Sequence, residues 1–87
     1  MVHEIWPVDA LGESRVIGES GDIFLMSVQI VGAYYVVDEG RYAADGERYL
    51  EGTSVRFYGK PGLLEHLRAS RHPDLFHKMD VLLTCSP

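Results

Sequence analysis

The chain has 87 residues with a net charge of −5, and 46% of its residues are hydrophobic, which is typical of one globular domain over residues 1–87, so we expect no disorder except at the ends. A single cysteine excludes an internal disulfide framework. The N-terminal MVHEIWPV lacks the basic segment and long apolar run of a secretion signal, so we expect a cytoplasmic protein.

The first two predicted strands are short. We place the first at Val2–Val8 and expect it at a sheet edge, because Pro7 cannot donate a hydrogen bond to a neighbouring strand. The second is Arg15–Gly18. Residues 19–22 then form a glycine-containing turn that leads into the longest apolar segment of the chain.

That segment, Ile23–Val37, contains no charged residue. Its β-branched and aromatic residues favour a strand over a helix, and it is too short for a bilayer span, which needs about 18 residues or more. The apolar residues at even positions show the two-residue period of a strand with one buried face, and they are Phe24, Met26, Val28 and Ile30. Gly32 marks either a sharp bend in one long strand or the meeting point of two strands.

Residues 38 to 58 predict an antiparallel meander. Turns are expected at Asp38–Gly40 and at Glu51–Gly52. Between them, Arg41–Leu50 should form a hairpin about its central Asp-Gly pair, because both residues tolerate positive φ. Thr53–Tyr58 adds a further strand. The short spacing leaves no room for the helical crossovers of a parallel sheet.

The last part of the chain predicts two short helices. They begin near Pro61 and Pro73, where proline suits the first helical turn. Each has an apolar stripe, made of Leu63, Leu64 and Leu67 in the first and of Leu75, Phe76 and Met79 in the second. Val81–Thr84 is expected as a short strand or an apolar tail. The fold class is therefore α+β, a curved antiparallel β-sheet of five to seven strands with two short C-terminal helices packed on one face.

Residues with catalytic or metal-binding chemistry form no known motif. The C-terminal histidines lack the i, i+4 spacing of a zinc site, so solvated or helix-end positions are expected, with Arg71 and His72 at the negative end of the first helix. Glu65 and His66 are adjacent and do not face each other on a helix. Cys85 lies in an apolar run, which predicts a buried, unreactive thiol. We expect no metal site, no cofactor and no enzymatic activity.

The charge is divided unevenly along the chain. Residues 1–52 hold ten acidic and three basic side chains, whereas residues 53–87 hold three acidic and five basic ones. An acidic sheet repels phosphate groups, so no nucleic-acid partner is expected, although Arg56 to Lys60 combines aromatic and basic residues. A core position for Phe57, with Arg56 and Tyr58 exposed, explains that segment more simply.

The tyrosines indicate a contact surface. Tyr42 and Tyr49 should stand close together across the hairpin, either as a structural cross-strand pair or as part of a protein-binding surface. Our leading hypothesis is a small acidic, non-catalytic protein-binding module, an inhibitor or immunity-type accessory protein that docks on a basic surface of another protein. Its expected contact residues are Asp38, Glu39, Tyr42, Asp45, Glu47 and Tyr49.

Two alternatives stay open. One is a small-ligand binding domain with an apolar pocket between the sheet and the helices, lined by Phe24, Met26, Tyr34 and Leu67. The other is a homodimer that forms through an exposed edge strand. A membrane partner is not expected, because the longest apolar segment is too short to span a bilayer.

Overall fold

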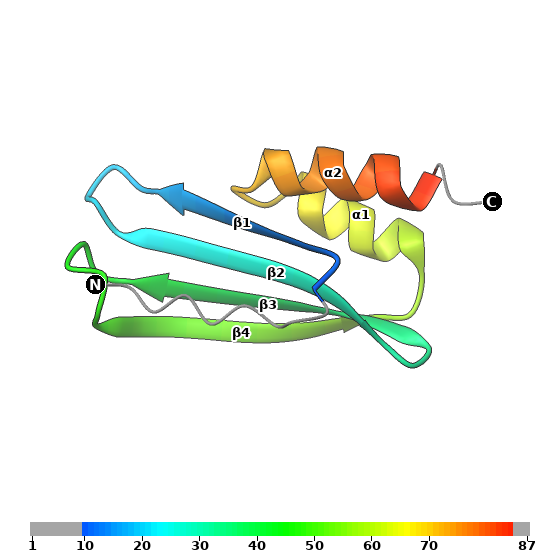
Figure 1. Cartoon of the computed structure of the whole chain (residues 1–87), viewed down its shortest axis with the longest axis horizontal. Helices are drawn as coiled ribbons and strands as arrows, with labels where there is room; N and C mark the ends of the chain where they lie inside the picture. The colour runs from blue at the N-terminus through cyan, green and yellow to red at the C-terminus, as the bar shows by residue number, and fades with distance from the viewer. Residues whose placement is uncertain (1–9, 85–87) are drawn as a thin grey trace.

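The computed structural model describes residues 10–84, which form a four-stranded antiparallel sheet and two helices (Figure 1). The strands lie across the sheet in chain order, so each neighbouring pair is a hairpin. The α+β class expected from the sequence is therefore confirmed. The elements are β1 (Gly12–Ile17), β2 (Ile23–Val31), β3 (Tyr34–Tyr42), β4 (Tyr49–Phe57), α1 (Lys60–Arg68) and α2 (Pro73–Thr84).

The uncharged segment Ile23–Val37 forms all of β2 and the first part of β3, the two central strands of the sheet, as its β-branched residues predict. β2 ends at Val31 and β3 begins at Tyr34, and these two residues pair directly across a two-residue turn. Gly32 in this turn has a φ of +59°, a left-handed conformation that glycine adopts without strain. Of the two expectations for Gly32, the meeting point of two strands is confirmed, and a bend within one strand is wrong.

The turns expected at residues 38–40 and 51–52 are wrong. β3 and β4 run through both segments, and Gly40 lies directly opposite Gly52 in the middle of the strand pair. The ring of Tyr49 lies against Gly52, where a side chain would clash with the tyrosine hydroxyl group. An aromatic ring that covers a glycine in this way stabilises the extended conformation, so the acid-glycine pairs do not act as turns here.

The number of strands also differs from the expected five to seven, since residues 10–84 contain four. Each of β3 and β4 joins segments that the false turns had separated in the prediction, and each has nine residues. The strand expected at Arg15–Gly18 corresponds to β1, which begins earlier, at Gly12. The strand expected at Val2–Val8 lies outside the described residues.

The core lies between one face of the sheet and the two helices. Its fully buried residues are Met26, Val28 and Val37 from the strands, and Leu63, Leu67, Leu75 and Met79 from the helices. The apolar stripes expected on both helices are thus confirmed. The even-numbered face of β2 is buried at Met26 and Val28, but Ile30, next to the turn, is 49% exposed. Ile23 and Leu25 on the odd-numbered face are buried as well, so β2 is covered on both faces.

The helices begin where the prolines predict. Pro61 lies in the first turn of α1, and Pro73 is the first residue of α2. The strand or apolar tail expected at Val81–Thr84 is wrong, because these residues form the last turn of α2. Leu83 explains the difference: it follows Met79 by four residues, continues the apolar stripe at helical spacing, and packs against the core.

Gly12 in β1 has no side chain, which lets α2 approach this strand closely. A Cβ atom at Gly12 would lie 2.8 Å from Met79 Cε and 3.0 Å from Leu75 Cδ1, which is too close for ordinary packing. Gly12 thus sets the distance between the first strand and the last helix.

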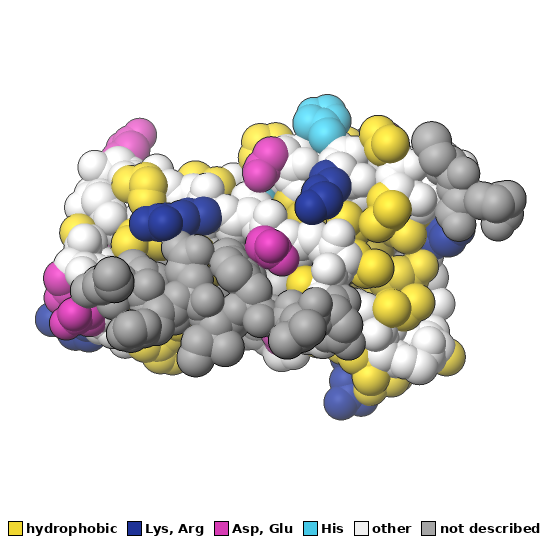
Figure 2. Space-filling model, viewed as in Figure 1, with side chains coloured by type: hydrophobic (Ala, Val, Ile, Leu, Met, Phe, Trp, Pro, Cys, Tyr) yellow, Lys and Arg dark blue, Asp and Glu magenta, His cyan; other side chains and the backbone are white. Residues whose placement is uncertain are grey.

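The helices cover only one end of the sheet, where β1 begins and β4 ends (Figure 1). Apolar side chains gather on the surface at this end (Figure 2), and in α2 Val81 is 61% and Leu82 44% exposed. Most of β4 is exposed. The expected packing of the helices on a sheet face is therefore realised over part of that face. Neither of the two described helices has the length and hydropathy that crossing a bilayer requires.

Candidate functional site

Hydrogen bonds within residues 43–48 build the tip of the β3–β4 hairpin. The Asp45 carboxylate accepts hydrogen bonds from the backbone N–H groups of Glu47, at 2.9 Å, and Arg48, at 3.1 Å. Across the turn, the Ala43 N–H donates to the Arg48 carbonyl at 2.9 Å. The two N–H donors hold the pKa of the Asp45 carboxyl below its usual value, so this group is charged at neutral pH. The turn is therefore held in shape around a carboxylate.

Tyr42 and Tyr49 face each other at the base of this turn, as the sequence predicts. Their ring centroids lie 5.5 Å apart with an angle of 66° between the ring planes, which is an edge-to-face contact. The register places both rings on the sheet face that points away from the helices. Tyr49 is 57% exposed, so the pair presents aromatic surface to solvent.

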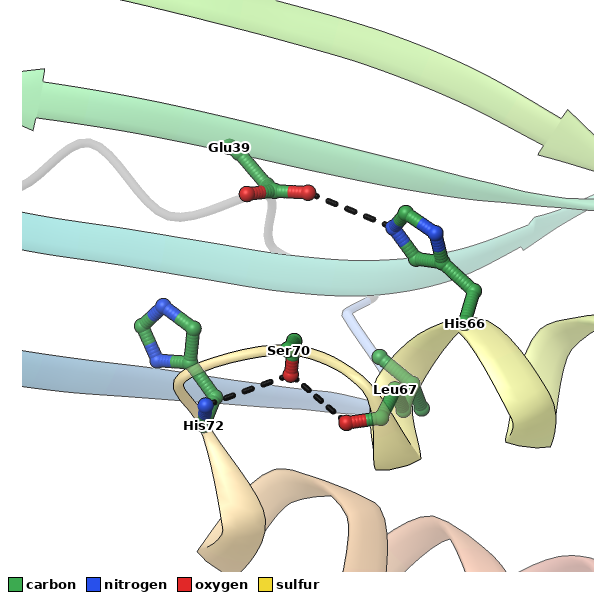
Figure 3. Close-up of polar contacts among 5 residues, drawn as sticks. All are labelled: Glu39, His66, Leu67, Ser70 and His72. Atoms are coloured by element: carbon green, nitrogen blue, oxygen red, sulfur yellow. Dashed lines mark hydrogen bonds and ion pairs between the residues drawn. The ribbon is translucent and has the colours of Figure 1, made fainter.

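Two of the six expected contact residues lie away from the tip. The four that the tip brings together are Tyr42, Asp45, Glu47 and Tyr49. Asp38 and Glu39 lie in the middle of β3 and, being adjacent in a strand, point to opposite faces of the sheet. Glu39 is on the helix side, where its Oε1 atom is 3.2 Å from Nε2 of His66 in α1 (Figure 3).

The described residues do not form the apolar pocket expected between sheet and helices. Met26 and Leu67 are fully buried within the packed core. Tyr34 lies on the opposite face of the sheet, with the guanidinium carbon of Arg56 5.0 Å from its ring centroid. Of the four expected lining residues, Phe24 lines an open groove at the junction of the sheet and the helix–helix loop.

The aromatic and basic segment at the end of β4 is divided between core and solvent, as expected. Phe57 packs against the core, and its ring centroid lies 5.0 Å from that of His66. Arg56 is exposed. Tyr58 is 74% exposed and lies 5.5 Å from Tyr34, ring centroid to ring centroid.

His72 is buried, so the expectation of a solvated histidine is wrong at this position; the residue does lie at a helix end, but directly before α2 and not at the end of α1. Its side chain is 1% exposed, and its Nδ1 atom lies 2.9 Å from the hydroxyl oxygen of Ser14 in β1. That hydroxyl donates to Asp74, with 2.9 Å to each carboxylate oxygen. Because the single hydroxyl proton points to Asp74, the proton between Ser14 and His72 belongs to Nδ1, which leaves Nε2 as an acceptor. Burial lowers the pKa of His72, which favours the neutral ring.

Ser14, His72 and Asp74 are the residue types of a serine hydrolase triad, but their order in space differs. A nucleophilic serine passes its proton to histidine, and the aspartate holds the histidine. Here Ser14 stands between the other two, donates to Asp74, and is 4% exposed. The cluster therefore ties β1 to the first turn of α2 and does not activate Ser14.

The loop between the helices holds His72 in place. The Ser70 hydroxyl donates to the Leu67 carbonyl at 2.6 Å and accepts the His72 backbone N–H at 3.2 Å (Figure 3). The His72 carbonyl accepts two N–H groups from the first turn of α2. In Figure 3 the imidazole ring extends from this loop toward the strands, on the side where Glu39 lies. Both the backbone and the ring of His72 are thus fixed.

An open groove of about 240 Å³ lies where this loop meets the uncovered part of the sheet. The groove walls include residues with charged or aromatic side chains, which are Phe24, Glu39, Arg41, Glu51, Arg71 and His72. The Arg71 guanidinium carbon is 3.8 Å from the Phe24 ring centroid. The Nη1 atom of Arg41 lies 3.6 Å from the Oε1 atom of Glu51. The Nε atom of Arg41 is the one buried side-chain polar atom among the described residues that lacks a hydrogen-bond partner.

The sequence did not predict this groove. Its residues come from β2, β3, β4 and the helix–helix loop, and no local pattern connects them. The sequence contained one signal for this site: His72 directly precedes Pro73. A residue before proline is restricted to extended conformations, so the chain leaves the helix at this position.

Within residues 10–84, no group of three or more His, Cys, Asp or Glu side chains is placed to hold a metal ion. The thiol of Cys85, expected to be buried, lies outside the described residues. Comparison of the chain with protein-family models, with curated proteins and with solved structures gives no match. Its function is therefore argued from the geometry of its sites.

Proposed function

We propose that this protein is a small, non-catalytic protein-binding module, an inhibitor or accessory protein of the immunity type, that docks through the tip of the β3–β4 hairpin on a basic surface of another protein. The observation that carries the proposal is that the tip is preformed. Hydrogen bonds to Asp45 fix the turn, and the rings of Tyr42 and Tyr49 pack at its base. A preformed surface loses little conformational freedom when it binds.

The chemistry of the tip fits a basic partner. Residues 45–51 carry three exposed carboxylates and one exposed guanidinium group. The exposed apolar surface beside them belongs to Tyr49, at 57%, and Leu50, at 36%. An aromatic centre with a charged rim is typical of interface hot spots, and the carboxylates steer a basic partner toward the tip.

Charge reversal at two well-separated carboxylates tests the proposal. A partner captured from an extract of the source organism is measured by surface plasmon resonance against the wild type, Glu47→Lys and Glu65→Lys. Glu65 is the matched control, because it is also an exposed carboxylate but lies in α1, at the opposite end of the sheet from the tip (Figure 1). We expect Glu47→Lys to slow association about tenfold at low salt and to flatten its salt dependence, while Glu65→Lys changes neither. Equal effects of the two substitutions would contradict docking through the tip.

A tyrosine substitution tests the aromatic centre separately. Tyr49→Ala should weaken binding by about 2 kcal/mol, mainly through faster dissociation, since a half-exposed tyrosine at the centre of an interface is a frequent hot spot. Tyr58→Ala is the control, because Tyr58 is more exposed but lies at the other end of β4. A partner that loses equal affinity with both variants does not bind at the tip.

The exposure of β4 favours self-association as a second kind of protein contact. All residues from Tyr49 to Arg56 are exposed, and β4 is an outer strand of the described sheet. An exposed outer strand can pair with the same strand of a second copy. Light scattering after gel filtration should then give a molecular mass that rises with protein concentration. For Val55→Lys, the mass should be that of one chain at all concentrations. A mass of one chain at all concentrations contradicts this mode.

A further inference from the structure

We propose that the groove between the helix–helix loop and the sheet binds a small zwitterion of the size and chemistry of a free α-amino acid. The carboxylate of the ligand binds the guanidinium group of Arg71. Its ammonium group donates to Nε2 of His72 and to the carboxylate of Glu39. The groove is on the helix side of the sheet, and the Tyr42–Tyr49 pair is on the other side, so this site does not depend on the proposed docking of the hairpin tip.

His72 supplies an acceptor that lacks a donor. Its Nδ1 atom is engaged with Ser14, whereas its Nε2 atom has no hydrogen-bond partner among the described residues. The side chain is 1% exposed, and what is accessible of it lines the groove. An N–H group of a ligand in the groove would give this acceptor a hydrogen-bond partner.

Arg71 supplies donors that lack an acceptor. Its guanidinium group is stacked on Phe24 at 3.8 Å and makes no ion pair or hydrogen bond with a described residue. The cation–π contact holds the group in the groove wall without using its N–H donors. A planar guanidinium group binds a carboxylate through two parallel hydrogen bonds, so a carboxylate is the ligand group that fits best.

The charge of the groove favours a ligand that carries both signs. Its walls contain two carboxylates, of Glu39 and Glu51, and two guanidinium groups, of Arg41 and Arg71. A phosphate group would be repelled by the carboxylates, and a simple amine would be repelled by the guanidinium groups. Glu39 and His72 both line the groove, so one ammonium group can interact with both side chains.

The size of the groove suits a ligand of few atoms. Its volume of about 240 Å³ is below the range of about 300 to 1,000 Å³ typical of sites for drug-sized molecules. A free amino acid therefore fits within this volume.

The test is an NMR titration of the ¹⁵N-labelled full chain with each of the common amino acids at millimolar concentration. At least one of them should give saturable shifts at the backbone amides of Arg71, His72 and Glu39. Its N-acetyl and carboxamide derivatives should bind about tenfold more weakly, because each lacks one of the two charges. Absence of saturable shifts at these amides, or equal binding of inorganic phosphate, would overturn the proposal.

Two arginine variants provide the matched control. Arg68 also stacks on a phenylalanine, Phe76, at 5.6 Å, but it lies on α1 outside the groove. Arg71→Gln should weaken binding about tenfold, and Arg68→Gln should leave it unchanged. Glu39→Gln, which keeps the shape of the side chain, should also weaken binding. Undiminished binding to folded Arg71→Gln would exclude the site.

Discussion

The Nδ1 atom of His72 lies 2.9 Å from the hydroxyl oxygen of Ser14, and this contact joins the helix–helix loop to the first strand. Ser14 in turn donates to Asp74, so the three groups form one chain of hydrogen bonds. Ser14→Ala should lower the free energy of unfolding by about 1 to 3 kcal/mol, because it leaves a buried N–H group of His72 without an acceptor. Urea unfolding followed by circular dichroism measures the change.

Ser54→Ala is the control for this substitution. Ser54 is exposed in β4, and its loss should change the free energy of unfolding by no more than about 0.5 kcal/mol. Identical urea midpoints for Ser14→Ala and the wild type would show that the hydrogen-bond chain does not stabilise the fold.

His72 should make stability depend on pH. Burial lowers its pKa below the usual value of about 6.5, even though Asp74 and Glu39 act in the opposite direction. As the pH falls through about 6.5, the unfolded chain binds a proton that the folded chain does not yet bind. The free energy of unfolding should therefore decrease as the pH falls through this window. Below the pKa of His72 in the folded chain, this histidine should cause no further decrease. Urea midpoints measured from about pH 8 to about pH 4 would show this decrease.

Two histidine substitutions separate this effect from other titrations. His72→Gln should remove the part of the pH dependence that begins near pH 6.5, whereas His77→Gln, at an exposed position of α2, should retain it. A pH profile of His72→Gln parallel to that of the wild type would assign the dependence to another group.

Gly52→Ala should destabilise the sheet. A Cβ atom at Gly52 would clash with the hydroxyl group of Tyr49 and lie 2.8 Å from the carbonyl oxygen of Glu39 in the neighbouring strand. The ring and the strand must both shift, at a cost of about 1 to 3 kcal/mol in the free energy of unfolding. Thermal or urea unfolding measures this loss.

Gly62→Ala in α1 is the matched substitution with the opposite expected sign. Its Cβ atom would lie 3.4 Å from Phe57 Cδ1, which is ordinary contact, and alanine favours a helix over glycine by up to about 1 kcal/mol. Loss of stability in both variants would mean that contact distance does not explain the effect at Gly52.

Local patterns were enough to predict the main elements. The β-branched residues from Ile23 onward predicted strands, and Gly32 predicted a break, because both signals depend on backbone preferences of neighbouring residues. Pro61 and Pro73 predicted the helix starts for the same reason. The hairpin with Tyr42 and Tyr49 at its base was also predictable from its central Asp-Gly pair, but the turn is wider than expected, over residues 43–48, and only Gly46 of the pair has a positive φ.

Long-range pairing was not predictable from one sequence. Two contacts illustrate this: Glu39 with His66, and Ser14 with His72. Both depend on the strand register and on the position of the helices, and neither pair shows a periodic spacing along the chain. The false turn at Glu51–Gly52 has the same origin, because the Tyr49 ring that stabilises the extended form is known only once the strands are paired. The groove, built from four separate segments, was missed for this reason.

Met79→Ala tests how closely α2 packs on the sheet. The Met79 side chain is fully buried and lies against Gly12 of β1, so truncation leaves a cavity that the backbone cannot easily fill. We expect a loss of about 2 to 5 kcal/mol in the free energy of unfolding, measured with urea. Leu82→Ala removes a comparable apolar side chain from the same helix, but at a position that is 44% exposed, and should cost less than about 1 kcal/mol. If the two variants lose equal stability, the last helix does not pack on the first strand through Met79.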